Sequence, residues 1–357
     1  MTTTERRLRT AFEDAARTIE PGSLAPLTIP SRRRRGTWTV PVAVAAALAM
    51  VLVGATLIGD RMRGGPPPAQ ALAAGGPQHI LAVRAGRAVV EDVTGHRLFE
   101  VPRAEGRYRA VAGTAREFFL AVQTTEDTYS FYRVTLGADG APSRPRKLPG
   151  PLFRTQTGFG KPENLAASPD GSKLAVVGTV DGHAQVDVID VRTGAHRIWR
   201  TPEGGAITSA TWSQDNRTLG FLWGPKAADL RLLDTRGDGA ELEDARVLRG
   251  SSIRSRAPGF GLINVFVFNP DGRTLTAQVQ GTKTGDHDDT GYVLLPLSAS
   301  TGEPAGRPVR LPSDSFFVKT DTTGRHLLQI IDGRPGRVED GRFSWISRAA
   351  DYDDAAW

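Results

Sequence analysis

A short turn followed by an alternating apolar strand recurs along this sequence, and no other feature restricts the fold as much. The clearest copy reads NLAASPDGSKLAVVG and runs from Asn164 to Gly178. In its turn, proline presets φ, aspartate hydrogen-bonds across the bend and glycine accepts a positive φ. Further copies, some of them weaker, read ATWSQDNRTLGFLWG (210–224), FVFNPDGRTLTAQVQG (266–281), FVKTDTTGRHLLQII (317–331) and AVAGTAREFFLAVQT (110–124). The turns recur about every 50 residues, a period typical of repeat architectures.

Each copy predicts a unit of four strands. After the strand that ends at Gly178 come a second turn, VDGH (180–183), a period-two run, QVDVIDV (185–191), and a third turn before HRIWR (196–200). This pattern predicts four antiparallel strands in about 45 residues. One such sheet cannot bury both of its faces, so the units must stack, and radial closure gives an all-β propeller.

The number of units favours six blades, with five or seven as alternatives. The segment ILAVRAGRAVVEDVTGHRLFEV (80–101) adds a first unit that holds only three strands. We expect the leftover strand GRFSWI, Gly341 to Ile346, to pair with this first unit and close the ring.

Two of these copies also resemble a known group of propellers. SPDGSKLAVV (168–177) with VDVIDVRTG (186–194), and NPDGRTLTAQ (269–278), are similar to WD-repeat and TolB-like propellers, although the full GH…WD signature is absent. The resemblance covers roughly Ile80 to Ile346. It implies the fold and leaves the function open, because propellers serve as enzymes, scaffolds and binding modules alike.

A long uncharged stretch near the amino terminus predicts one membrane span. Residues 36–59 carry no charge and would form a helix of about 36 Å, long enough for a bilayer core of about 30 Å. Arg32 to Arg35 precede it, so the amino terminus should be cytoplasmic and the carboxyl terminus outside. A signal peptide cleaved near Ala71 is the alternative. The expected parts are a cytoplasmic head (1–35), a transmembrane helix (36–59), a Pro/Gly-rich linker (60–78), an extracytoplasmic propeller (79–348) and a C-terminal tail (349–357).

The head predicts a short amphipathic helix. Leu8, Phe12, Ala15 and Ile19 recur at helical spacing, and a proline and a glycine follow at 21–22. The segment is either a topogenic signal or a docking helix, with Leu8 and Phe12 as its anchors. A short helix, basic linker, single span and outer propeller also resemble actinobacterial membrane proteins, some linked with extracytoplasmic-function sigma factors. That resemblance implies a sigma factor as cytoplasmic partner, although the absence of cysteine rules out the zinc-binding His-Cys-Cys pattern of common anti-sigma domains.

Charge and motifs argue against several functions. Four of the six net positive charges lie in residues 1–59, so the nearly neutral remainder gives little reason to expect nucleic-acid binding. There is no G-x-S-x-G motif. The acidic run TGDHDDTG (284–291) is expected to be a solvated hairpin loop, with a calcium site as the less favoured alternative. We expect Trp199, Trp212 and Trp223 to pack between blades.

No catalytic, cofactor-binding or metal-binding residue is predicted. The sequence favours a non-catalytic, membrane-anchored module outside the cell that binds or senses a protein, peptide or envelope component. The alternative is a propeller hydrolase or lyase with its active site in the central channel. Charged side chains that converge on the channel from several blades would favour the enzyme, whereas apolar, Ser and Thr residues there would favour binding.

Overall fold

The computed structural model divides the chain into two compact units, Met1–Pro68 and Ala69–Trp357. The structure describes residues 76–114, 117–154, 165–201, 205–224, 229–239, 241–248, 260–281, 291–314, 317–321 and 323–357, all in the second unit. The predicted head with Leu8 and Phe12, the predicted span and most of the linker lie outside these residues. Within the described ranges, no helix has the length and apolar character needed to cross a bilayer.

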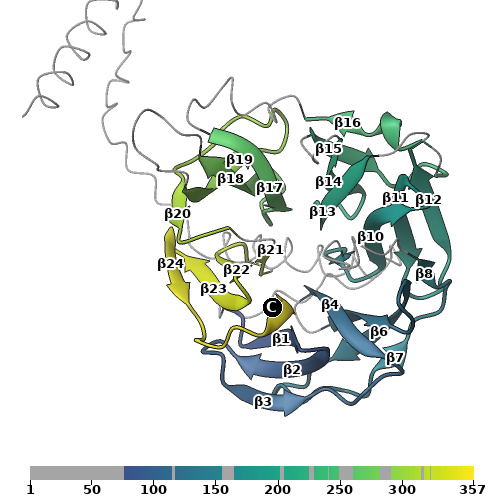
Figure 1. The fold of residues 1–357 in the computed structure, drawn as a ribbon. Helices are drawn as coiled ribbons and strands as arrows, with labels where there is room; N and C mark the ends of the chain where they lie inside the picture. Colours follow the sequence, from purple (N-terminus) through teal and green to yellow (C-terminus); the bar gives the residue numbers. More distant parts are fainter. Residues whose placement is uncertain are drawn as a thin grey trace, which may run out of the picture. The chain divides into compact units, whose positions relative to one another are not determined.

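Six antiparallel sheets are arranged radially, so the second unit is a six-bladed β-propeller (Figure 1). The strand order follows the predicted unit, and the first strand of each blade contacts the first strands of its neighbours around the centre. The blade count and the three-stranded first unit are therefore confirmed. Blade 1 consists of β25 (Tyr352–Ala356), β1 (His79–Arg84), β2 (Arg87–Asp92) and β3 (Arg97–Glu100).

The other five blades are each formed by consecutive strands. Blade 2 holds β4 (Arg107–Thr114), β5 (Glu117–Gln123), β6 (Thr128–Thr135), β7 (Arg146–Lys147) and β8 (Phe153–Arg154), and β7 and β8 both pair with β6. Blade 3 holds β9 (Leu165–Ala167), β10 (Lys173–Val180), β11 (His183–Asp190) and β12 (His196–Arg200). Blade 4 holds β13 (Ala206–Trp212), β14 (Thr218–Gly224), β15 (Asp229–Asp234), the 3-10 turn η1 (Leu242–Asp244) and β16 (Arg246–Val247). Blade 5 holds β17 (Phe260–Phe268), β18 (Thr274–Gly281), β19 (Tyr292–Ser298) and β20 (Val309–Leu311). Blade 6 holds β21 (Phe317–Thr320), β22 (His326–Ile331), β23 (Arg334–Glu339) and β24 (Arg342–Trp345).

The strand that closes the ring differs from the predicted one. β25 is the innermost strand of blade 1 and pairs with β1 beside the centre of the ring (Figure 1). Gly341–Ile346, predicted for this role, instead forms β24, the outer strand of blade 6. Asp340 and Gly341, with φ of 50° and 72°, make a tight two-residue hairpin that keeps β24 beside β23. The closing strand comes from the residues set apart as a tail, where two aspartates interrupt the apolar pattern of a strand.

The repeated turns have the predicted backbone. Gly171, Gly272 and Gly324 adopt φ of 69°, 64° and 71°, and Asn216 takes the same place in blade 4 with φ of 53°. Asparagine is the residue that most often replaces glycine in this left-handed region. The SQDN turn therefore keeps the geometry of the PDG turns without their glycine.

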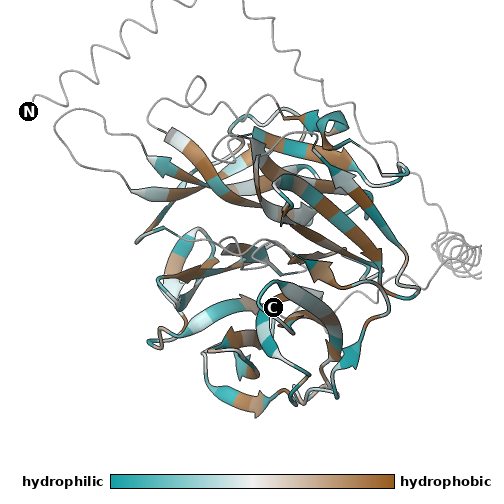
Figure 2. Ribbon diagram, turned by 45° about the vertical axis from the view of Figure 1, so that its right-hand side comes forward, coloured by the Kyte–Doolittle hydropathy of each residue, from teal (hydrophilic) through white to brown (hydrophobic). Residues whose placement is uncertain are grey.

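The core lies between neighbouring blades. Strands such as β1 and β5 carry runs of consecutive buried apolar residues, because each sheet packs against a neighbouring sheet on both of its faces (Figure 2). Trp199 and Trp212 are buried in the cluster shared by blades 3 and 4, and Trp223 packs against that cluster, as predicted. The propeller is therefore stabilised mainly by burial between blades rather than within any one sheet.

Candidate functional site

The propeller has two ends with different connections. At one end the first strand of a blade turns into the second, and the third into the fourth. At the other end the second strand turns into the third, and the chain passes to the next blade. We call the first end the turn face, defined by the turns that contain Asp92, Asp170, Asp190, Asp215, Asp234 and Asp271. We call the second end the loop face, defined by the strand ends at Arg84, Trp223, Leu262, Arg334, Trp345 and Tyr352.

The chain joins the propeller at the turn face. His79 begins β1 at this end, and Gly76 lies against the His326 ring, where an added Cβ would come within 2.7 Å of that ring. The Nδ1 atom of His326 lies 2.9 Å from Asp321, and its Nε2 atom lies 3.1 Å from Glu339. The segment that leads from the predicted tether therefore meets the propeller at its turn face.

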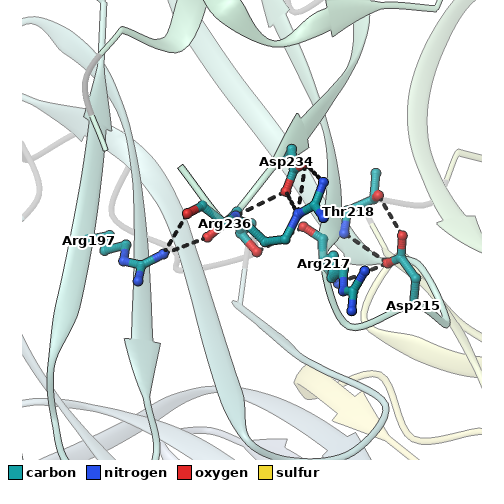
Figure 3. Close-up of polar contacts among 7 residues, drawn as sticks. Arg197, Asp215, Arg217, Thr218, Asp234 and Arg236 are labelled. Carbon is teal, nitrogen blue, oxygen red and sulfur yellow. Dashed lines mark hydrogen bonds and ion pairs between the residues drawn. The ribbon is translucent and has the colours of Figure 1, made fainter. Parts of the chain in front are cut away.

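Aspartates at the turn face accept hydrogen bonds from their own turns. Asp215 accepts from the backbone N–H of Arg217 and Thr218 at 2.9 and 2.8 Å, and Asp271 accepts from the N–H of Arg273 and Thr274 at 2.8 and 2.9 Å. The Asp215 turn is drawn in Figure 3. These bonds satisfy backbone donors that have no partner in the sheet.

Arginines at the turn face are bound in the same way (Figure 3). Arg236 forms an ion pair with Asp234, and Arg197 of blade 3 donates to the carbonyl oxygens of Thr235, Arg236 and Gly237 in blade 4 at 3.0, 3.2 and 3.1 Å. The bond from Arg236 lowers the pKa of Asp234 to about 2. For Asp215 and Asp271, burial opposes ionisation, but the hydrogen bonds outweigh it and lower the pKa of each carboxyl. These groups stay ionised near neutral pH and serve the turns themselves.

The inner strands of blades 3, 4 and 5 contain no ionisable residue. β9 reads LAA, β13 reads AITSATW and β17 reads FGLINVFVF. Their hydroxyl groups connect blades, since Ser209 Oγ accepts from the N–H of Phe266, and Thr211 Oγ1 accepts from the N–H of Phe268, both at 3.1 Å. In these three blades the composition is the one expected of a binding module rather than an enzyme, whereas the inner strands of blades 6 and 1 carry Lys319 and Asp354.

One buried ion pair connects the remaining inner strands. Asp354 of β25 lies 2.7 Å from Lys319 Nζ of β21 and accepts from the N–H of Val111 in β4 at 2.8 Å. Lys319 also donates to the carbonyl oxygen of Val111. Burial raises the pKa of Asp354, and Lys319 opposes that shift. The pair joins blades 6, 1 and 2 around the closing strand, so its evident role is to hold the ring shut.

The loop face carries apolar and aromatic groups that are open to solvent. In the described part of the chain, four of the five large hydrophobic residues that are exposed lie at this end: Leu152, Val247, Leu262 and Trp345. Three arginines stack on aromatic rings here. The distance from the guanidinium carbon Cζ to the ring centre is 4.7 Å for Arg84 on Tyr352, 4.0 Å for Arg231 on Trp223 and 4.1 Å for Arg334 on Trp345. Arginine, tryptophan and tyrosine are the residue types most enriched in the energetic centres of protein interfaces.

These arginine–aromatic pairs were not predicted from the sequence. Arg334 and Trp345 are eleven positions apart and meet only because the hairpin of β23 and β24 places Trp345 opposite Gly336. The acidic run 284–291 lies outside the described residues except for Gly291. Among the residues that the structure describes, no cluster of three His, Asp or Glu residues is arranged to hold a metal ion.

Comparison with known proteins gives structural matches only. No model of a protein family matches the chain, and no curated protein matches it. TolB from Acinetobacter baumannii superposes with a TM-score of 0.55 at 15% identity, over 78% of this chain and 66% of the TolB chain. Chains of a nidogen/laminin complex (15% identity, 73% of this chain and 89% of that one) and of the mitotic checkpoint complex (11%, 71% and 69%) both give a TM-score of 0.44. The alignment spans just under two thirds of the TolB chain, and at this identity it shows the fold alone, a six-bladed β-propeller.

Proposed function

We propose that this protein is a non-catalytic binding module whose loop face receives a protein or peptide partner. The observation that supports this most is the difference between the two faces. At the turn face, the aspartates and arginines described above bind turns of their own blade or, for Arg197, of the next blade. At the loop face, stacked arginines and exposed apolar side chains remain open to a partner.

The physical basis is the usual energetics of interfaces. An exposed apolar side chain such as Leu262 stabilises a complex when a partner removes it from water, by about 25 cal/mol per Å² of buried surface. An arginine that is already stacked on an aromatic ring has lost part of its rotamer freedom, so less entropy is lost on binding. The inner strands β9, β13 and β17 also offer no acid or base for a channel-based reaction.

The proposal includes a membrane tether. Residues 36–59 would hold the propeller outside the cell, with the amino terminus in the cytoplasm, because the stretch is uncharged and follows Arg32 to Arg35. Alkaline phosphatase fused after Trp357 should then be active. Activity confined to a cytoplasm-dependent reporter at the same place would contradict this orientation.

The head would contact a cytoplasmic protein, with a sigma factor as the proposed partner. Leu8 and Phe12 lie one helical turn apart and suit a helix-in-groove contact. A photoreactive residue at position 12 should crosslink to a protein in intact cells, and Leu8→Asp should abolish that adduct. Crosslinking of position 12 to lipid alone would leave the head as a topogenic segment.

Capture of partners tests the binding function itself. Full-length protein would be crosslinked in envelope preparations of its host, and the recovered proteins quantified by mass spectrometry. Leu152→Asp combined with Leu262→Asp should remove the specific partners, while Gln214→Asp combined with Arg217→Asp at the turn face should retain them. Loss with the turn-face variant and retention with the loop-face variant would reverse the assignment.

A further inference from the structure

Buried polar atoms without a partner are concentrated between blades 5 and 6. Nine such side-chain atoms occur in the described residues, and four of them belong to this interface: Gln278 Oε1, Gln329 Nε2, Gln329 Oε1 and Arg334 Nε. Both glutamines are completely buried. An unpaired buried polar atom destabilises the folded state, so four at one interface require an explanation.

The strand registers place these side chains on facing sides of the two blades. Gln329 pairs with Val318 and Gly336, and its neighbour Leu327 packs in the cluster that blade 6 shares with blade 5. Gln278 pairs with Val265 and Leu294, which belong to the same cluster. Arg334 lies two residues from Gly336 on β23, and therefore on the same side of the sheet.

At the loop face this interface ends in an ordered aromatic platform. The guanidinium of Arg334 lies 4.1 Å from the centre of the Trp345 ring, and Phe343 meets Trp345 edge to face at 4.9 Å. The Phe343 ring lies so close to Gly336 that an added Cβ would come within 2.4 Å of it. Trp345 is nevertheless 39% exposed. Phe343 therefore holds the Trp345 ring on the protein side, while part of the ring remains exposed to solvent.

Arg334 differs from the other two stacked arginines in its ionic partners. Arg84 forms ion pairs with Glu91 at 2.8 Å and Asp351 at 2.7 Å, and Arg231 has only Asp229 at 3.8 Å. Arg334 forms none with any described residue. Asp314 lies at the same interface but accepts from Asn264 and Gln278 instead. The stack occupies the face of the Arg334 guanidinium and leaves the in-plane N–H donors of its two terminal nitrogens, which unlike Nε are not among the buried unpaired atoms, for a carboxylate.

We propose that this corner of the loop face binds an acidic peptide segment of the partner protein. One carboxylate of the segment pairs with Arg334, and an adjacent apolar side chain lies on Trp345. Charge complementarity supports this occupant, because Arg334 is the stacked arginine to which the described residues supply no anion. The inference rests on the proposed binding function and specifies the chemistry of one of its contacts.

The test uses two fluorescent decapeptides and the full-length protein. One peptide has two glutamates flanking a leucine–phenylalanine pair, and its twin has glutamine in both places. The glutamate peptide should bind about tenfold more tightly than its twin, which corresponds to about 1.4 kcal/mol. Arg334→Gln should weaken the glutamate peptide about tenfold and make the two peptides equal. Arg342→Gln, at an exposed position on β24, should change neither affinity.

Two further variants separate the contributions of charge and stacking. Trp345→Ala should weaken both peptides, and Asp332→Asn, which removes an exposed acid near Arg334, should strengthen the glutamate peptide only. Far-ultraviolet circular dichroism would verify that each variant is folded.

Several outcomes would overturn the inference. They are equal binding of the two peptides to the unmodified protein, no binding of either at millimolar concentration, and affinities unaffected by Arg334→Gln. Self-association lost in Trp345→Ala, or binding to anionic vesicles lost in Arg334→Gln without an effect on the peptides, would assign the corner to a second copy or to lipid. In each case, partners that still depend on Leu152 and Leu262 would leave the proposed function intact.

Discussion

The two faces of the propeller use the same kinds of residue for different purposes. At the turn face, aspartates and arginines are paired within or between turns, as with Asp234 and Arg236. At the loop face, Arg334 stacks on Trp345 without an ionic partner among the described residues, and the buried Gln329 amide at the same blade interface has no hydrogen bond. The turn-face groups therefore stabilise the turns, whereas the Arg334 guanidinium has donors that the proposed partner would use. Such departures from local satisfaction are expected at functional sites.

Opening the ring should have the largest effect and should disrupt both faces together. Asp354→Ala leaves Lys319 without its carboxylate and the N–H of Val111 without its acceptor in a buried site. We expect a loss of about 3–5 kcal/mol in the free energy of unfolding, measured by denaturant titration. Asp351→Ala, at an exposed ion pair on the same segment, should cost less than about 1 kcal/mol. Similar losses for the two variants would contradict the role given to Asp354.

Filling the unsatisfied interface should stabilise the protein. Gln329→Leu replaces a buried amide with no hydrogen bonds by an apolar side chain of similar size. We expect the free energy of unfolding to rise by about 1–3 kcal/mol in the absence of a partner. A clear loss of stability would show that Gln329 is already satisfied in the free protein and would remove one support for the blade 5–6 site.

The turns should be sensitive to backbone conformation alone. Gly272 has φ of 64°, and an added Cβ would meet no atom closer than 3.9 Å. Gly272→Ala should cost about 1 kcal/mol, because alanine tolerates this region poorly. Gly272→Asn should cost less, since Asn216 occupies the equivalent place in blade 4. Thermal unfolding of the two variants would distinguish this from a steric effect, which would penalise asparagine more.

Acid should lower the free energy of unfolding through the turn-face aspartates, and Arg334 should make no contribution to this decline. The pKa values of Asp215, Asp234 and Asp271 lie below the unfolded value of about 3.9. The stability they contribute is therefore complete above about pH 4 and is lost as the pH falls towards about 2, the pKa of Asp234. Asp215→Asn with Asp271→Asn should flatten this decline by a small amount, because both groups are largely solvated. Arg334→Gln should leave the slope unchanged, because it removes no carboxylate.

Much of the fold was predictable because its signals are local. The Pro-Asp-Gly turns and the period-two strands gave the four-stranded unit and the six blades, since each turn is specified by residues adjacent in sequence. The closing strand was not predictable in this way. Its pairing with β1 joins segments more than 260 residues apart, and Asp354 looks like a solvent-facing residue until Lys319 and Val111 are placed around it.

The site was less predictable than the fold for a related reason. The turn-face aspartates could be assigned to turns from their neighbours alone. Arg334 is a candidate binding residue because no described residue forms an ion pair with it. The positions of possible partners in space cannot be read from a sequence. Its stacking on Trp345 depends on the register of β23 and β24, and on the closeness of Phe343 to Gly336.

Photocrosslinking at matched positions on the two faces tests the central claim most directly. A photoreactive residue would replace Leu262 at the loop face or Gln214 at the turn face, both exposed, in full-length protein produced in its host. Illumination of intact cells should give a discrete protein adduct from position 262 and none from position 214. An adduct from position 214 without one from position 262, or the same adduct from both, would contradict the assignment of binding to the loop face.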